Sequence, residues 1–193
     1  MDDEELLARI RAGDEAAFNA LVARYGPLML RIALSHTPSR AVAEEVVQEA
    51  WLGVVQGLPK FEGRSSLKTW ILRIVANRAR TRGERERRSV PFGDDRPVVD
   101  PSRFTPEGAW GVPPTEWPED RLLQAETLER VNAAIDRLPP RQQEVLVLRD
   151  VEGWQPAEVG EALNLTDGNQ RVLLHRARAK VREELERYFQ EAA

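Results

Sequence analysis

Seven of the chain's 13 prolines fall within residues 89–120, and this cluster divides the sequence into two parts. Proline lacks the backbone N–H that a helix or a central strand needs, and its ring blocks helical continuation, so we expect no packed element there. In a chain of 193 residues, the segments on either side are each long enough for one small domain. The sequence therefore predicts domains over 1–88 and 121–193, joined by an extended linker over 89–120.

The composition excludes several classes of functional site. The chain has no cysteine and two widely spaced histidines, which leaves no thiol nucleophile, no thiolate ligand and too few imidazoles for a zinc centre. We expect His36, near a helix end, to be a surface or capping residue. The start of the chain is acidic without an apolar signal region, and no apolar run approaches the roughly 18 residues of a membrane span. The sequence thus predicts a cytoplasmic protein with no cofactor, metal ion or membrane span.

Apolar residues on both sides of the linker recur with helical spacing. Two or three amphipathic helices are predicted within 6–33, with breaks at Gly13-Asp14 and Gly26-Pro27. A further helix over 40–57 has a wide apolar stripe that extends to Val55. The other predicted helices cover 67–88, 128–138, 142–151, 156–163 and 167–189. Because no stretch alternates with the period of a strand, the predicted fold is all-α.

The net charge of −4 conceals two basic stretches. Residues 60–88 carry ten basic and three acidic side chains, and residues 168–182 carry five basic side chains and no acidic one. The linker is acidic, with seven acidic and two basic side chains. Neutralisation of phosphates is local, whereas net charge governs only solubility and non-specific encounter. The segregation therefore indicates two separate contacts with nucleic acid.

The last two predicted helices have the spacing of a helix-turn-helix. Thr166 or Asp167 can accept hydrogen bonds from the first N–H groups of the last helix, and the arginines beyond lie where a recognition helix meets a major groove. A bundle of three or four helices that binds no DNA has the same apolar periodicity. The pattern alone leaves both interpretations open.

Two longer strings are more specific: AEEVVQEAWLGVVQGLPKFEGRSSLKTWILRIVANRAR over 43–80 and LPPRQQEVLVLRDVEGWQPAEVGEALNLTDGNQRVLLHRARAKVR over 138–182. They resemble conserved regions 2 and 4 of the sigma-70 family of RNA polymerase sigma factors, in its small extracytoplasmic-function (ECF) branch. The order of the two motifs and the proline-rich spacer fit this resemblance. It implies a region 2 domain over 1–88 and a region 4 domain over 121–193.

The resemblance implies two roles for the first domain. In the family, a helix with the pattern E-x-x-Q-E docks on the clamp of core RNA polymerase, and Glu45, Gln48 and Glu49 occupy those positions on one helical face. The loop and helix that follow separate the strands of the −10 element and capture extruded bases. The corresponding residues are Lys60, Phe61, Arg64, Ser65, Lys68, Trp70, Arg73, Asn77, Arg78 and Arg80. Trp70 also lies on the apolar stripe, and we favour a core role for it over base stacking.

The resemblance assigns the −35 element to the last helix. Arginine pairs bidentately with guanine or clamps phosphates, and asparagine or glutamine reads adenine. The candidate residues are Asn169, Gln170, Arg171, His175, Arg176 and Arg178. The chain departs from the common family run at Val172 and Leu173, where the family has a polar and a basic residue. We expect this departure to alter the −35 preference and to shift one contact toward a thymine methyl group.

The sequence thus predicts a two-domain, all-α transcription initiation factor without catalytic residues of its own. Its expected partners are core RNA polymerase, promoter DNA and an anti-sigma factor, and the free protein is expected to be a monomer. The alternative is a stand-alone helix-turn-helix regulator, which would have no use for the basic stretch in the first domain. A hydrolase using the carboxylates of 2–5 or 183–184 is disfavoured, because both groups lie at terminal, exposed positions.

Overall fold

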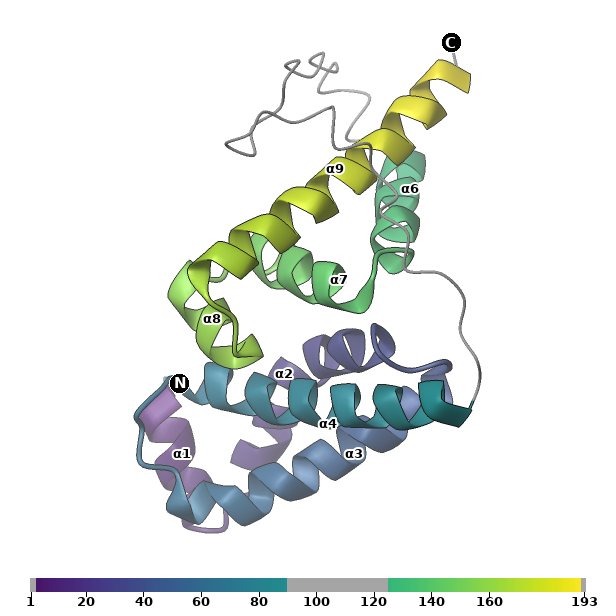
Figure 1. Ribbon diagram of the computed structural model, residues 1–193. Coiled ribbons are helices and arrows are strands. Elements are labelled where there is room, and N and C mark those ends of the chain that lie inside the picture. Colours follow the sequence, from purple (N-terminus) through teal and green to yellow (C-terminus); the bar gives the residue numbers. More distant parts are fainter. Residues whose placement is uncertain (1–2, 90–124, 192–193) are drawn as a thin grey trace. The chain divides into compact units, whose positions relative to one another are not determined.

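The computed structural model describes residues 3–89 and 125–191, and all regular elements within those ranges are helical (Figure 1). The predicted all-α fold is confirmed for these residues. Contacts divide the chain into two units, 1–92 with 157–165 and 93–156 with 166–193. The predicted linker, apart from Ser89, lies outside the described residues.

Residues 3–89 form four helices and one short turn. These are α1 (Asp3–Arg11), α2 (Glu15–Leu34), α3 (Arg40–Gly57), the 3-10 turn η1 (Leu58–Lys60) and α4 (Leu67–Ser89). Helices α2, α3 and α4 pack against one another, and α1 packs on α2. Side chains of Asp14, Ser39 and Ser66 accept hydrogen bonds from backbone N–H groups of the first turns of α2, α3 and α4. Such caps satisfy donors that a helix leaves open, so they fix where these helices begin.

Helix α2 is continuous through Gly26 and Pro27, so the predicted interruption there is wrong. Proline removes one helical hydrogen bond, which disfavours a helix interior locally. Leu21, Met29 and Ile32, on both sides of the proline, are nevertheless all buried. Because these side chains belong to one packed apolar face, tertiary packing outweighs the local cost of the proline.

The turn between α2 and α3 lies very close to α4. A Cβ atom added at Gly83 would lie 2.4 Å from the carbonyl oxygen of His36, so no side chain fits at this position without a backbone shift. His36 is itself buried, so the expected surface position is wrong, while its backbone N–H donates to the Ala33 carbonyl oxygen at the end of α2, as the expected capping residue would. Glycine at 83 is what permits the close packing of the turn on the helix.

The C-terminal part of the chain contains α6 (Ala125–Asp136), α7 (Pro140–Leu146), the π-helical turn η3 (Val147–Val151), α8 (Pro156–Leu163) and α9 (Asp167–Glu191). Both α6 and α7 pack against α9. The single helix predicted over 142–151 is divided in the structure: it is α-helical as far as Leu146 and π-helical from Val147 to Val151. Residues 142–148 are all buried, because this segment lies at the centre of the packing.

Candidate nucleic-acid interfaces

The outer face of α3 carries the three polar side chains expected to bind a protein partner. Glu45, Gln48 and Glu49 are all exposed. Glu49 Oε2 lies 3.4 Å from Arg78 Nη1, and Glu45 Oε2 lies 3.2 Å from Arg82 Nη2. Both arginines belong to α4, so the ion pairs link the acidic face of α3 to the basic helix. The carboxylates remain open enough to solvent to exchange these partners.

Two apolar side chains extend this face, and sequence reasoning missed their exposure. Leu52 is 62% exposed and Val55 is 52% exposed, while Val54 between them is fully buried. The assignment of Val55 to the packed apolar stripe is therefore wrong. Leu52 follows Gln48 by four residues and Glu49 by three, which is the spacing of one helical face. We call Glu45, Gln48, Glu49, Leu52 and Val55 the α3 face.

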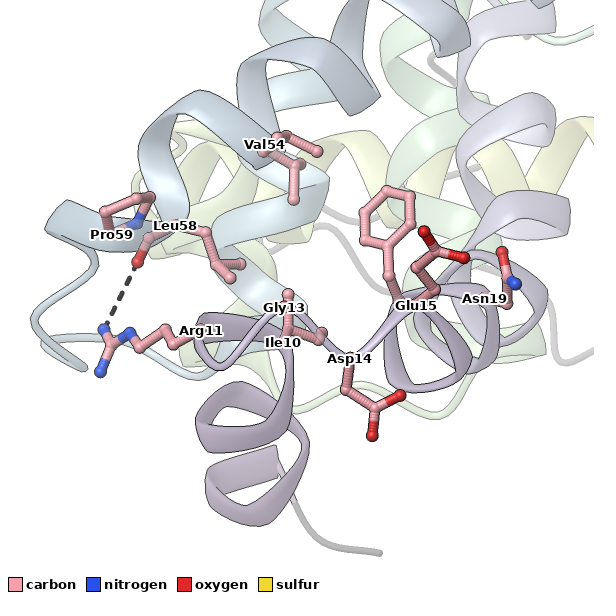
Figure 2. A pocket seen from close by; sticks show the side chains of 11 residues that line it. Ile10, Arg11, Gly13, Asp14, Glu15, Asn19, Val54, Leu58 and Pro59 are labelled. Carbon is pink, nitrogen blue, oxygen red and sulfur yellow. Dashed lines mark hydrogen bonds between the residues drawn. The ribbon is translucent and has the colours of Figure 1, made fainter.

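A pocket of about 710 Å³ adjoins the end of α3. Figure 2 shows Arg11 reaching from the end of α1 toward Leu58, and its guanidinium donates hydrogen bonds to the carbonyl oxygens of Leu58 and Phe61. Val55 lines the pocket as well as belonging to the α3 face. The lining residues are Ile10, Arg11, Gly13, Asp14, Glu15, Phe18, Asn19, Val54, Val55, Leu58 and Pro59. The pocket thus continues the α3 face as a hollow with apolar walls and a charged rim.

The segment from η1 to the start of α4 contains five of the residues expected at the −10 element. Lys60 and Arg64 are exposed, Arg64 pairs with Glu62, and Phe61, Ser65 and Lys68 are half-buried. The Phe61 ring packs on the Trp70 ring, with centroids 4.9 Å apart. A Cβ atom at Gly57 would lie 2.8 Å from the Trp70 ring. Trp70 is thus held between Gly57 and Phe61, and this packing supports its expected structural role.

The remaining candidates belong to helix α4, and two of them, Arg78 and Arg80, are half-buried. Arg73 and Asn77 are exposed, and Asn77 Oδ1 accepts a hydrogen bond from Arg80 Nη2. Arg80 Nε also donates to the carbonyl oxygen of Ala76, and Arg78 is engaged with Glu49. Hydrogen bonding to Arg80 orients the Asn77 amide, so the nitrogen rather than the oxygen is left to donate outward.

Hydrogen bonds fix the turn from α8 into α9. Asn164 adopts a left-handed backbone conformation with φ of 53°, and Thr166 Oγ1 accepts a hydrogen bond from the Asn169 N–H. Of the two cap candidates in the sequence, Thr166 and Asp167, it is Thr166 that accepts this bond. Gln170 is only 4% exposed, and its Nε2 donates to the carbonyl oxygen of Pro156 at 2.8 Å. The expected adenine contact of Gln170 disagrees with this buried position, because its amide nitrogen donates to the Pro156 carbonyl oxygen instead.

The other candidates of α9 lie on or near its exposed side. Asn169, Arg171 and Arg176 are exposed, whereas Leu174 and Ala177 face the core. Arg178 is also exposed, but its Nε and Nη2 donate to the two carboxylate oxygens of Asp150 in η3, at 2.8 and 2.7 Å. This bidentate ion pair raises the pKa of Arg178 above its usual value. Asp150 therefore competes with any phosphate for Arg178.

His175 is half-buried on α9. Burial lowers its pKa below the usual value of 6.5, and the nearby positive charge of Arg178 lowers the pKa further. The imidazole is consequently neutral near pH 7. A neutral ring suits packing or a hydrogen bond better than a charge contact with phosphate.

The described residues hold no candidate metal centre, since within 3–89 and 125–191 no three His, Asp or Glu side chains come together as ligands. No helix in the same part of the chain has the length and apolar character needed to cross a membrane.

Two family descriptions match the chain: Sigma-70 region 2 over residues 21–89 and Sigma-70, region 4 over residues 128–181. The RNA polymerase sigma-H factor of Pseudomonas aeruginosa is 28% identical over 98% of this chain and 97% of its own length. The ECF RNA polymerase sigma factor SigG of Mycobacterium tuberculosis is 37% identical over 89% of this chain. The match covers 48% of SigG, so this chain spans about half the length of that relative. The solved structure of the sigma factor RpoE from Bartonella quintana, in complex with the anti-sigma factor NepR, has a TM-score of 0.62 at 20% identity and covers 88% of this chain and 96% of its own.

Proposed function

Because the chain belongs to the sigma-70 family of RNA polymerase sigma factors, in its extracytoplasmic-function branch, we propose that it binds core RNA polymerase and directs initiation at promoters with −35 and −10 elements. The observation that carries this function is the presence of regions 2 and 4, in that order, in one chain. Sigma factors are initiation factors rather than catalysts. We accordingly assign the chain no reaction of its own, and the polymerase performs the chemistry.

The α3 face is the proposed docking surface for core polymerase. It combines three polar side chains of the family pattern with Leu52 and Val55, which are exposed although apolar. Exposed aliphatic side chains beside charged ones are typical of a surface that is covered in a complex. The ion pairs of Glu45 and Glu49 with α4 orient the carboxylates before the partner arrives.

The η1–α4 segment is the proposed −10 contact. Arg73 and Lys60 are exposed cations suited to phosphates, and Asn77 presents an amide nitrogen that can donate to a base edge. Opening a duplex costs stacking and pairing energy, which contacts with single-stranded DNA offset. Arg64, Ser65, Lys68, Arg78 and Arg80 are assigned to the same contact. Phe61 and Trp70 support it by packing on each other.

The exposed side of α9 is the proposed −35 contact, with Asn169, Arg171 and Arg176 as its principal residues. Their exposure and their place in the first half of the helix suit insertion into a major groove. Arg178 stays paired with Asp150 in the native chain and joins these residues when that carboxylate is removed. His175 contributes packing, and the Gln170 amide is occupied by its hydrogen bond to the Pro156 carbonyl oxygen.

Regulation by an anti-sigma factor is proposed by analogy with the Bartonella quintana RpoE, which was solved with such a partner. A protein that covers the α3 face would exclude core polymerase from it. We further propose that the free chain is monomeric and acts in the cytoplasm, where RNA polymerase is found.

The test is a run-off transcription assay with core polymerase, with and without the full chain, on a pool of genomic fragments. New chain-dependent start sites that share spaced −35 and −10 elements are the expected result. Tight DNA binding by the chain alone, without polymerase binding or new starts, would instead establish a stand-alone helix-turn-helix regulator. The salt dependence of that binding distinguishes the two, because a regulator acting alone needs many phosphate contacts of its own.

A further inference from the structure

Val172 is an exposed aliphatic side chain within the exposed, basic side of α9. It is 48% exposed, although it stands only five residues after Asp167, the first residue of the helix. An α-helix turns by about 100° per residue, which places Val172 about 160° away from both Gln170 and Leu174. Both of those residues are buried. Val172 is thus directed away from the packed side of its own unit.

The neighbours of Val172 are polar or charged. Asn169 precedes it by three residues, Arg171 is adjacent, and Arg176 follows it by four, and all three are exposed. No acidic residue occurs between positions 168 and 182. Within α9, Val172 is the one large apolar side chain that is exposed among the described residues. An isolated aliphatic group among cations is poorly suited to an apolar protein partner, which would need a wider patch.

The chemistry of the major groove supplies a matching group. Thymine is the one base whose major-groove edge carries a methyl group, and aliphatic side chains contact it without needing a hydrogen bond. Arginines on either side neutralise phosphates and hold the helix in the groove. Resting on the proposed function, we propose that Val172 is a specificity-determining residue that selects thymine at one position of the −35 element through its C5-methyl group.

The test removes only that methyl group. The full chain bound to core polymerase first selects transcribed templates from a pool randomised over the −35 region. Each thymine of the selected element is then replaced in turn by deoxyuridine, which keeps every hydrogen-bonding group, and binding of the holoenzyme is measured. One replacement is expected to weaken binding about fourfold, as for loss of one buried methyl group. The same replacement is expected to have no effect on a holoenzyme carrying Val172→Ser.

Val151→Ser is the matched control, because Val151 is equally exposed, at 49%, and lies in η3 outside α9. This control holoenzyme is expected to keep the fourfold methyl effect. The inference is overturned if no deoxyuridine weakens binding, if the selected element contains no thymine, or if Val172→Ser retains the effect. Those results leave chain-dependent transcription intact. Absence of any chain-dependent transcript would overturn the proposed function as well, so the two failures are distinguishable.

Discussion

Asp150 holds Arg178 by two parallel hydrogen bonds, which join the turn η3 to the basic helix α9. The two residues are 28 positions apart in the chain, and one of them is a proposed −35 contact. The carboxylate of Asp150 fixes the orientation of the Arg178 guanidinium, and its negative charge offsets the positive charge that would attract a phosphate. DNA binding by Arg178 therefore requires that a phosphate replace Asp150.

The first prediction follows from this competition. Asp150→Asn removes the competing charge, so we expect tighter promoter binding by the holoenzyme. The slope of log K against log salt should also become steeper by about 0.9, the contribution of one additional phosphate contact. Binding measured at several salt concentrations checks both effects. Glu126→Gln changes the net charge equally but lies in α6, where it pairs with Arg130, and it should leave the slope unchanged. An equal slope for Asp150→Asn and the native chain would contradict the prediction.

The second prediction concerns the α3 face. Leu52→Glu places a charge where the proposed surface meets core polymerase, and we expect affinity for the polymerase to fall about tenfold. Because Leu52 is 62% exposed, the thermal stability of the chain should not change. Affinity is measured by titrating labelled chain with core polymerase. Leu34→Glu is the control, since Leu34 is an exposed aliphatic residue of α2 outside the α3 face. Unchanged affinity in Leu52→Glu would exclude Leu52 from the interface.

The third prediction concerns the contact between α4 and the α2–α3 turn. Gly83→Ala would place a Cβ atom 2.4 Å from the His36 carbonyl oxygen, which forces the backbone to shift. We expect a loss of about 1–3 kcal/mol in the free energy of unfolding, although alanine favours a helix more than glycine does. Gly168→Ala is the matched control, because nothing lies within 4 Å of its Cβ position in α9. That variant should show no loss in the free energy of unfolding, since alanine favours a helix more than glycine does. Urea unfolding followed by circular dichroism measures both changes.

Helical periodicity was sufficient to predict the all-α fold, because apolar spacing reports directly which side of a helix is packed. It failed where local and tertiary effects compete. Pro27 reads as a break, yet Leu21, Met29 and Ile32 hold α2 together across it. Val55 reads as part of the packed stripe, yet the stripe is narrower than the run of apolar residues in α3.

The sequence indicates on which helix face a candidate residue lies, but not with which other residue it forms an ion pair or a hydrogen bond. The E-x-x-Q-E pattern identified Glu45 and Glu49, and the helical period placed them on one face. Their arginine partners lie on another helix, 29 to 37 residues further along the chain, and no local pattern reports such pairs. Gln170 shows the same limit, because polar residue type alone does not distinguish a base contact from a buried amide that joins two helices.

The last prediction concerns pH and His175. Its pKa in the folded chain lies below the usual 6.5, chiefly because burial disfavours the charged ring and also because Arg178 is near. The unfolded chain therefore binds more protons than the folded chain as the pH falls below about 6.5, and stability decreases with acidification in that window. Above it the imidazole is neutral in both states and has no such effect.

His175→Gln removes this titration, so the melting temperature of the variant should fall less than that of the native chain between pH 7.5 and 5.5. Thermal melts of both proteins at the two pH values check the difference. An equal decrease for the native chain and His175→Gln would contradict the prediction.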